Sequence, residues 1–180
     1  MKLNFTSTLL HWHTHTNTRV MPWKGEKDPY KIWLSEIILQ QTRVEQGLAY
    51  YNKFIEAYPT VFDLAKAKEQ TVFKLWEGLG YYNRCRNLLV TAKMIAVNYK
   101  GVFPNDYETL LTLKGVGPYT AAAIASFAFN APHAVLDGNV FRVIARYEGI
   151  DTPTDTTAGK KIFEIRAAAL LDKKRAGLYN

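Results

Sequence analysis

Cysteine is almost absent from this sequence, because Cys85 is the only one among 180 residues. A disulfide within the chain needs two cysteines, and a metal centre ligated only by thiolates needs several. The sequence therefore excludes an internal disulfide and any all-cysteine metal cluster built from this chain alone. We interpret Cys85 as a small packing residue rather than a nucleophile, and we predict no metal site.

Long hydrophobic runs are also lacking, although 48% of the residues are hydrophobic. No segment approaches the roughly 18 apolar residues that a membrane-spanning helix requires, and the first residues lack the pattern of a secretory signal. The hydrophobic content is enough for a sizeable core, which argues against intrinsic disorder. We expect a soluble, intracellular protein without a membrane partner.

Acidic residues are the scarcer charged class, with 16 Asp and Glu against 23 Lys and Arg. The resulting net charge of +7 and the isoelectric point near 9.4 indicate a polyanionic partner such as nucleic acid, because lysine and arginine neutralise phosphates. This charge is a weak signal when taken alone, since many basic proteins bind no nucleic acid.

Alternating hydrophobic patterns that would predict a sheet are missing, and helical patterns follow one another between short polar turns. The fold class is therefore predicted to be all-α. Asp28 is typical of an N-cap and Pro29 of a first helical residue, so a helix buried on most sides is expected over 28–42. Further helices are expected at 46–57, 69–77, 81–99, 106–113, 118–129, 139–148 and 157–171, with helix ends at Gly78, Gly80 and Gly101.

The segment from Leu113 to Thr120, with sequence LKGVGPYT, lies between two of these helices. Its two glycines permit a tight turn in which successive backbone N–H groups are exposed at the start of the second helix. Such a turn is an anion site, so Gly115, Val116 and Gly117 are candidate contacts to a phosphate. An ordinary helix–helix turn is the alternative interpretation of this segment alone.

A second polar helix start follows at LDGNV, residues 136–140. Capping this helix is the commonest role for a residue such as Asp137. Its functional interpretation is an ionised carboxylate that can stabilise a developing cation, because backbone donors and the helix dipole favour its charged form.

These two segments together resemble the helix-hairpin-helix and aspartate signature of the base-excision DNA glycosylases. Pro22-Trp23, PYKIWLSEIILQQT over 29–42 and GLGYYNRCRN over 78–87 narrow the resemblance to the adenine-specific DNA glycosylases of the MutY type. The resemblance extends from about Leu9 to about Asn180. It implies a helix-hairpin-helix DNA glycosylase fold in which two helical domains flank a catalytic cleft, one domain over 24–131 and the other formed by 1–23 plus 132–180.

Glu36 and Asp137 are expected to form a pair of carboxylates in different protonation states. Ile32 and Trp33 lie about one helical turn before Glu36, so an apolar setting should raise the pKa of Glu36 and keep it protonated. The resemblance implies that Glu36 is the general acid that protonates adenine, while Asp137 stabilises the sugar cation or a covalent intermediate. Without the surrounding motif, Glu36 would be interpreted as a surface acid near Arg43.

The resemblance also implies roles for Tyr119 and Asn139. Related bifunctional glycosylases carry a lysine where this chain has Tyr119, so we predict a monofunctional enzyme that leaves an abasic site. Tyr119 is expected near the reacting sugar, with an ordinary packing tyrosine as the alternative. Asn139 is expected to support Asp137 and the catalytic water.

A target base in duplex DNA must be flipped out of the helix, and side chains must fill the gap. The resemblance implies Gln41 and Tyr81 as these wedge residues, whose alternatives are a helix-face amide and a core aromatic. It also implies that Arg19, Trp23 and Lys24 border the adenine pocket.

The sequence departs from the family near its end. The family normally continues into four cysteines that hold an iron–sulfur cluster and then into a domain that reads oxidised guanine. Neither is present, so we expect a chain cut off before the cluster. A cation at the hairpin is compatible with the resemblance but does not follow from the residues.

The leading hypothesis is hydrolytic removal of adenine mispaired with 8-oxoguanine or guanine in double-stranded DNA. We expect a monomer, located in the cytoplasm or nucleoid if its source is bacterial. The main alternative is a catalytically silent DNA-binding or partner-binding module derived from such a glycosylase. A bifunctional lyase acting on oxidised pyrimidines is disfavoured by Tyr119 and by the Gln40-Gln41 pair.

Overall fold

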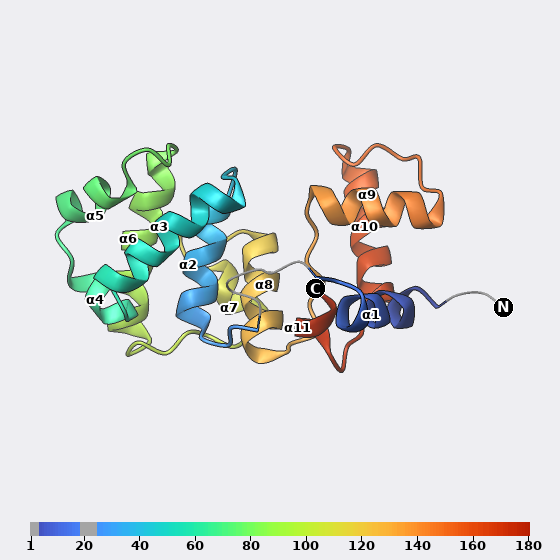
Figure 1. Ribbon diagram of the computed structural model, residues 1–180, viewed down its shortest axis with the longest axis horizontal. Coiled ribbons are helices and arrows are strands. Elements are labelled where there is room, and N and C mark those ends of the chain that lie inside the picture. Colours follow the sequence, from blue (N-terminus) through green and yellow to red (C-terminus); the bar gives the residue numbers. More distant parts are fainter. Residues whose placement is uncertain (1–3, 19–24) are drawn as a thin grey trace.

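The computed structural model describes residues 4–18 and 25–180, and every regular element in these two ranges is an α-helix (Figure 1). The predicted all-α class is confirmed. None of the described helices is both long and apolar enough to cross a membrane. The helices are α1 (Phe5–His15), α2 (Pro29–Leu39), α3 (Val44–Ala57), α4 (Val61–Lys66), α5 (Glu69–Trp76), α6 (Tyr82–Asn98), α7 (Tyr107–Leu111), α8 (Pro118–Phe129), α9 (Gly138–Glu148), α10 (Thr157–Leu170) and α11 (Ala176–Tyr179).

Helix α2 begins as the sequence predicted. Asp28 caps it by accepting a hydrogen bond from the Tyr30 N–H at 2.9 Å, and Pro29 is its first residue. The helix ends at Leu39, short of the predicted end at residue 42, and Gln41 has a left-handed backbone with φ 56°. An α-helix contains no such conformation, so the interpretation of Gln41 as a helix-face amide is wrong.

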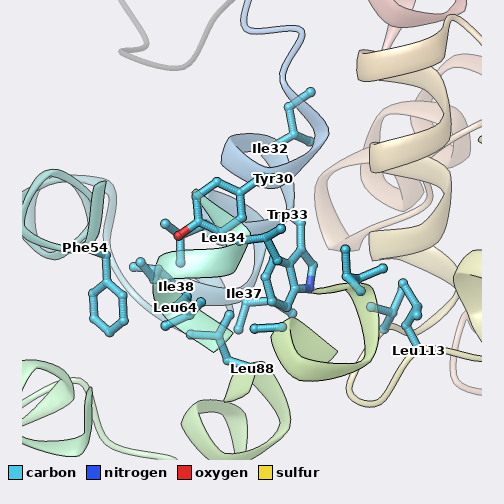
Figure 2. Packing of buried hydrophobic residues seen from close by; sticks show 14 of the residues in the cluster. Tyr30, Ile32, Trp33, Leu34, Ile37, Ile38, Phe54, Leu64, Leu88 and Leu113 are labelled. Atoms are coloured by element: carbon cyan, nitrogen blue, oxygen red, sulfur yellow. The ribbon is translucent and has the colours of Figure 1, made fainter. Parts of the chain in front are cut away.

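The core of the molecule is built around α2. Trp33, Leu34 and Ile38 are fully buried there, and α3, α6 and α8 all pack against this helix. Figure 2 shows side chains of α2 meeting Leu64 and Leu88 from neighbouring segments of the same cluster. The apolar residues on nearly every side of α2 thus explain its burial, as the sequence predicted.

Two short helices were not predicted from the sequence. Helix α4 starts at a capping box in which Thr60 and Asp63 bond each other's backbone N–H groups. Helix α11 packs against both α8 and α1, and its Gly177 N–H donates to the Asn130 side chain at 3.1 Å. The segment that contains α11 therefore brings the end of the chain back to α8.

Two groups of helices can be followed in Figure 1, with α2–α8 on the left and α1, α9 and α10 on the right. We call them the large group and the small group. The chain passes from one to the other between α8 and α9, and α11 lies where they meet. The predicted domain boundaries, 24–131 and 1–23 plus 132–180, stay a prediction.

Candidate active site

A cavity of about 520 Å³ lies between the two groups of helices. Its wall includes Glu36 from α2, Tyr119 from α8, His13 from α1 and Leu178 from α11. Pockets of this size are typical of sites that hold small molecules, and a single nucleobase is smaller than the ligands that fill most of them. The cavity is therefore the natural place for chemistry that involves Glu36.

Glu36 reaches solvent only in part, and surrounding protein removes most of the water from its carboxyl. This burial raises the pKa of Glu36 from 4.5 to about 7, and the nearby charge of Asp137 acts in the same direction. A hydrogen bond with Tyr119 favours the ionised form but does not outweigh burial. Glu36 is therefore able to hold a proton near neutral pH, as the sequence predicted, and it is not an ordinary surface acid.

Tyr119 stands in the first turn of α8, directly after the hairpin. Burial raises the pKa of its hydroxyl, and the charges of Glu36 and Asp137 raise it further. The phenol therefore stays neutral and can donate a hydrogen bond to the Glu36 carboxyl. This contact brings Tyr119 into the site, so it is more than a packing residue of the core.

Asp137 is the N-cap of α9, which confirms the local interpretation of this residue. Its Oδ1 accepts hydrogen bonds from the backbone N–H groups of Asn139 at 3.0 Å and Val140 at 2.8 Å. Its Oδ2 accepts from the Asn139 side-chain amide at 2.9 Å, and Arg142 donates to the oxygen of that amide. Three donors and the start of a helix therefore surround the carboxylate, an arrangement that suits a negative charge.

The predicted hairpin connects α7 to α8. Gly115 has φ 80°, and a Cβ there would lie 2.8 Å from the Cβ of Asn87, so only glycine fits this position without a shift. Thr91 on α6 anchors the turn by donating to the Lys114 carbonyl at 2.8 Å. The side chain of Val116 is buried, whereas Gly115 and Gly117 are exposed. The hairpin thus offers backbone rather than side-chain atoms to a partner.

Gln41 and Tyr81 are both exposed and both adopt left-handed backbone conformations that non-glycine residues rarely accept. Gln41 follows the end of α2, and Tyr81 is the N-cap of α6. Tyr81 has 64% of its surface exposed, so its interpretation as a core aromatic is wrong. The neighbouring Tyr82 instead stacks on Phe73.

Not all predicted site residues can be located. Arg19, Trp23 and Lys24 lie outside the described residues. Sequence reasoning also missed two features of the site. The first is the contribution of α1 and α11 to the cavity wall, which no local pattern indicates. The second is Arg84, whose partners belong to distant parts of the chain, although its motif GLGYYNRCRN was noticed.

The residues present do not fit an iron–sulfur cluster. Cys85, the one cysteine, is fully buried among the side chains of the large core, and burial raises the pKa of its thiol to about 12. No group of three or more His, Cys, Asp or Glu side chains within residues 4–18 and 25–180 is arranged to hold a metal ion. We therefore derive no chemical step that involves a cluster.

Comparisons with known proteins match this geometry. The family model of the HhH-GPD superfamily base excision DNA repair proteins matches residues 34–166, which include Glu36, the hairpin and Asp137. The chain belongs to this superfamily.

Curated proteins similar to this chain include adenine DNA glycosylases. It is 44% identical over 149 residues to the adenine DNA glycosylase of Buchnera aphidicola subsp. Baizongia pistaciae, covering 83% of this chain and 42% of that protein. It is 38% identical over 186 residues to the adenine DNA glycosylase of Homo sapiens, covering 98% of this chain and 34% of that protein. The chain thus spans less than half the length of both relatives.

The solved structure of a thermostable thymine-DNA glycosylase has the same fold. It matches with a TM-score of 0.84 at 31% identity, and the match covers 97% of this chain and 82% of that one. The predicted helix-hairpin-helix DNA glycosylase fold is therefore confirmed.

Proposed function

We propose that this chain is a monofunctional adenine DNA glycosylase, which hydrolyses the bond between adenine and deoxyribose in double-stranded DNA. The observation that carries the proposal is Glu36, whose pKa is raised to about 7 by burial and by the nearby charge of Asp137, in the wall of a cavity large enough for a base. The adenine preference is supported by the names of the curated relatives. Adenine opposite 8-oxoguanine or guanine is the proposed target.

The proposed reaction uses the two carboxylates in different states. Protonated Glu36 donates its proton to a ring nitrogen of adenine, and the electron pair of the glycosidic bond moves onto the departing base. The charged Asp137 stabilises the positive charge that develops on the sugar. Water then adds to the anomeric carbon and releases a proton, which leaves an abasic site and free adenine. Asn139 orients Asp137 through the bond described above.

Duplex DNA is the proposed partner, bound by a monomer. The exposed residues Gly115 and Gly117 suit the binding of a phosphate by backbone N–H groups, and the exposed side chains of Gln41 and Tyr81 suit the gap left by the flipped base. A cation at the hairpin stays a prediction. Such a substrate would locate the activity with the chromosome, which is in the cytoplasm or nucleoid if the source is bacterial.

A monofunctional reaction is proposed because no lysine stands where Tyr119 lies against Glu36. A phenol cannot form the Schiff base through which a lysine cleaves the strand. We therefore expect borohydride to trap no stoichiometric covalent complex with DNA. Efficient trapping would show that the enzyme is a lyase.

The experiment that tests the proposal is a single-turnover assay on duplex DNA with adenine opposite 8-oxoguanine, followed by alkali to break abasic sites. We expect alkali-dependent cleavage that Glu36→Gln and Asp137→Asn both abolish. The rate should fall as the pH rises through about 7, because Glu36 then loses the proton that it must donate. DNA binding without cleavage would support a catalytically silent module instead.

A further inference from the structure

Arg84 donates hydrogen bonds to four backbone carbonyls, three of which belong to a distant part of the chain. Its Nη1 donates to the carbonyl oxygens of Ile37 at 2.9 Å, Ile38 at 3.0 Å and Gln40 at 2.6 Å. These carbonyls belong to the last turn and the C-cap of α2, where an α-helix leaves its acceptors without partners. A guanidinium at this end of a helix is also favoured by the helix dipole.

The same guanidinium holds the loop before α6. Its Nη2 donates to the Leu79 carbonyl at 3.2 Å, and the group lies 5.2 Å from the Trp76 ring and 5.5 Å from the Tyr81 ring. Trp76 is fully buried and donates from its indole to the Gly80 carbonyl at 2.9 Å. The guanidinium of Arg84 therefore contacts the exposed ring of Tyr81 and the buried ring of Trp76, and Trp76 limits its movement.

On each side of Arg84, its contacts lie at or next to a residue with a left-handed backbone conformation. On one side Arg84 holds the carbonyl of Gln40, which is directly followed by Gln41 at φ 56°. On the other side it touches the ring of Tyr81, whose φ is 46°. Such conformations persist only where the surrounding structure enforces them. Arg84 therefore bonds the residue directly before one strained position and contacts the ring of the other.

We propose that Arg84 is a positioning residue that holds Gln41 and Tyr81 together as one preformed wedge for base flipping. The proposal rests on the proposed function, because it assigns Arg84 to the extrusion of the target base rather than to bond cleavage. A preformed wedge enters the DNA stack without first ordering two loops, so the entropy of ordering them is not lost when DNA binds.

The variant that tests this idea is Arg84→Lys. A lysine keeps the positive charge, but its flexible stem and single nitrogen cannot hold the carbonyls at the end of α2 and the loop before α6 at the same time. It lacks the planar face for the two rings and the second nitrogen that reaches Leu79. Arg86→Lys is the matched control, because Arg86 lies on the same helix and is exposed. It bonds the side chain of Asn83 and lies 5.9 Å from the Phe73 ring.

The first measurement uses the free protein, in which backbone hydrogen exchange is followed at residues 40–42 and 78–81. Arg84→Lys should accelerate exchange in both segments by about tenfold, as expected when a charge-assisted hydrogen bond is lost, whereas Arg86→Lys should not. Unchanged hydrogen exchange in Arg84→Lys would overturn the proposal, whether or not the protein removes adenine from DNA.

The second measurement follows base flipping without chemistry. Each variant is combined with Glu36→Gln and mixed with duplex DNA carrying 2-aminopurine opposite 8-oxoguanine, because 2-aminopurine brightens when it leaves the stack. We expect the brightening of the Glu36→Gln parent to survive Arg86→Lys and to drop by about tenfold with Arg84→Lys. Equal brightening in all three proteins overturns the role of Arg84 alone. No brightening in the parent overturns the proposed function together with the wedge.

Discussion

The large and small groups of helices differ sharply in how much they bury. Among the described residues, the main core of the large group contains 25 buried side chains, whereas the core between α9 and α10 contains three, Ile144, Phe163 and Ala167. The small group also borders a second cavity of about 250 Å³, which is lined mainly by apolar side chains of α1 and α9. The large group of helices therefore supports its part of the site with an extensive core, whereas the small group has few buried side chains to support its part.

The two catalytic candidates reflect this difference. Glu36 belongs to the large group, and surrounding protein gives it a raised pKa. Asp137 belongs to the small group, and its surroundings are the first N–H groups of its own helix together with the side chain of Asn139. Tertiary burial thus sets the environment of the Glu36 carboxyl, whereas local backbone geometry sets that of the Asp137 carboxylate. A core of few buried side chains is sufficient to support Asp137, because the N–H groups that a capping residue bonds belong to its own helix.

The largest expected effect on stability comes from replacing a buried phenylalanine by alanine in each core. Phe54 and Phe163 are both fully buried, and each meets an aromatic ring edge to face. Phe54→Ala should cost about 3–5 kcal/mol in the free energy of unfolding, because the dense surroundings cannot close over the cavity. Urea unfolding followed by circular dichroism measures this loss.

Phe163→Ala should instead act locally. We expect fast hydrogen exchange in α9 and α10 while α2–α8 keep their protection, because Phe163 belongs to a separate small cluster. A single cooperative transition with equal losses of protection in both groups would contradict the contrast between the two cores.

The second effect concerns the buried acid. Folding raises the pKa of Glu36 from 4.5 to about 7, so the native state binds more protons than the unfolded state between these values, and stability falls as the pH rises through this window. One pKa unit corresponds to about 1.4 kcal/mol, so Glu36→Gln should become more stable than the parent by about 3 kcal/mol above pH 7. Urea unfolding at pH 4.5 and at pH 8 measures this difference.

Glu56→Gln on the exposed face of α3 removes the same charge without the same burial. This variant should follow the parent at both pH values. If Glu36→Gln gave no pH-dependent gain over Glu56→Gln, burial would not be the source of the contrast between Glu36 and Asp137.

The smallest expected effect is a difference in stability between alanine substitutions at two glycines with left-handed backbone, one in each group of helices. Gly149 ends α9 with φ 69° and has no neighbour within 4 Å of an added Cβ. Gly149→Ala should therefore cost only about 1–2 kcal/mol for the left-handed backbone. Gly115→Ala meets the same cost plus the collision with Asn87, which should add about 1–3 kcal/mol. Equal midpoints for the two variants in urea unfolding would show that the hairpin is as loosely packed as the end of α9.

Much of the fold follows from local signals. Asp28-Pro29 starts α2, Asp137 starts α9, and Gly78, Gly80 and Gly101 adopt the left-handed conformations expected at helix ends. Even α4, which was missed, has a readable start in the Thr60 capping box. The missed helix α11 is different, because four residues are too few to show a hydrophobic period.

The sequence by itself determined the helical class, the hairpin and the cap at Asp137, because caps, glycines and periodic apolar residues act over a few positions, whereas Glu36 was singled out through the family resemblance. The tertiary structure alone decided that Glu36 meets Tyr119 in a cavity, that Gln41 leaves its helix, and that Arg84 links the ends of α2 and the loop before α6. Burial, distant carbonyl partners and left-handed backbone depend on segments far apart in the chain. Their effect appears only once packing has brought those segments together.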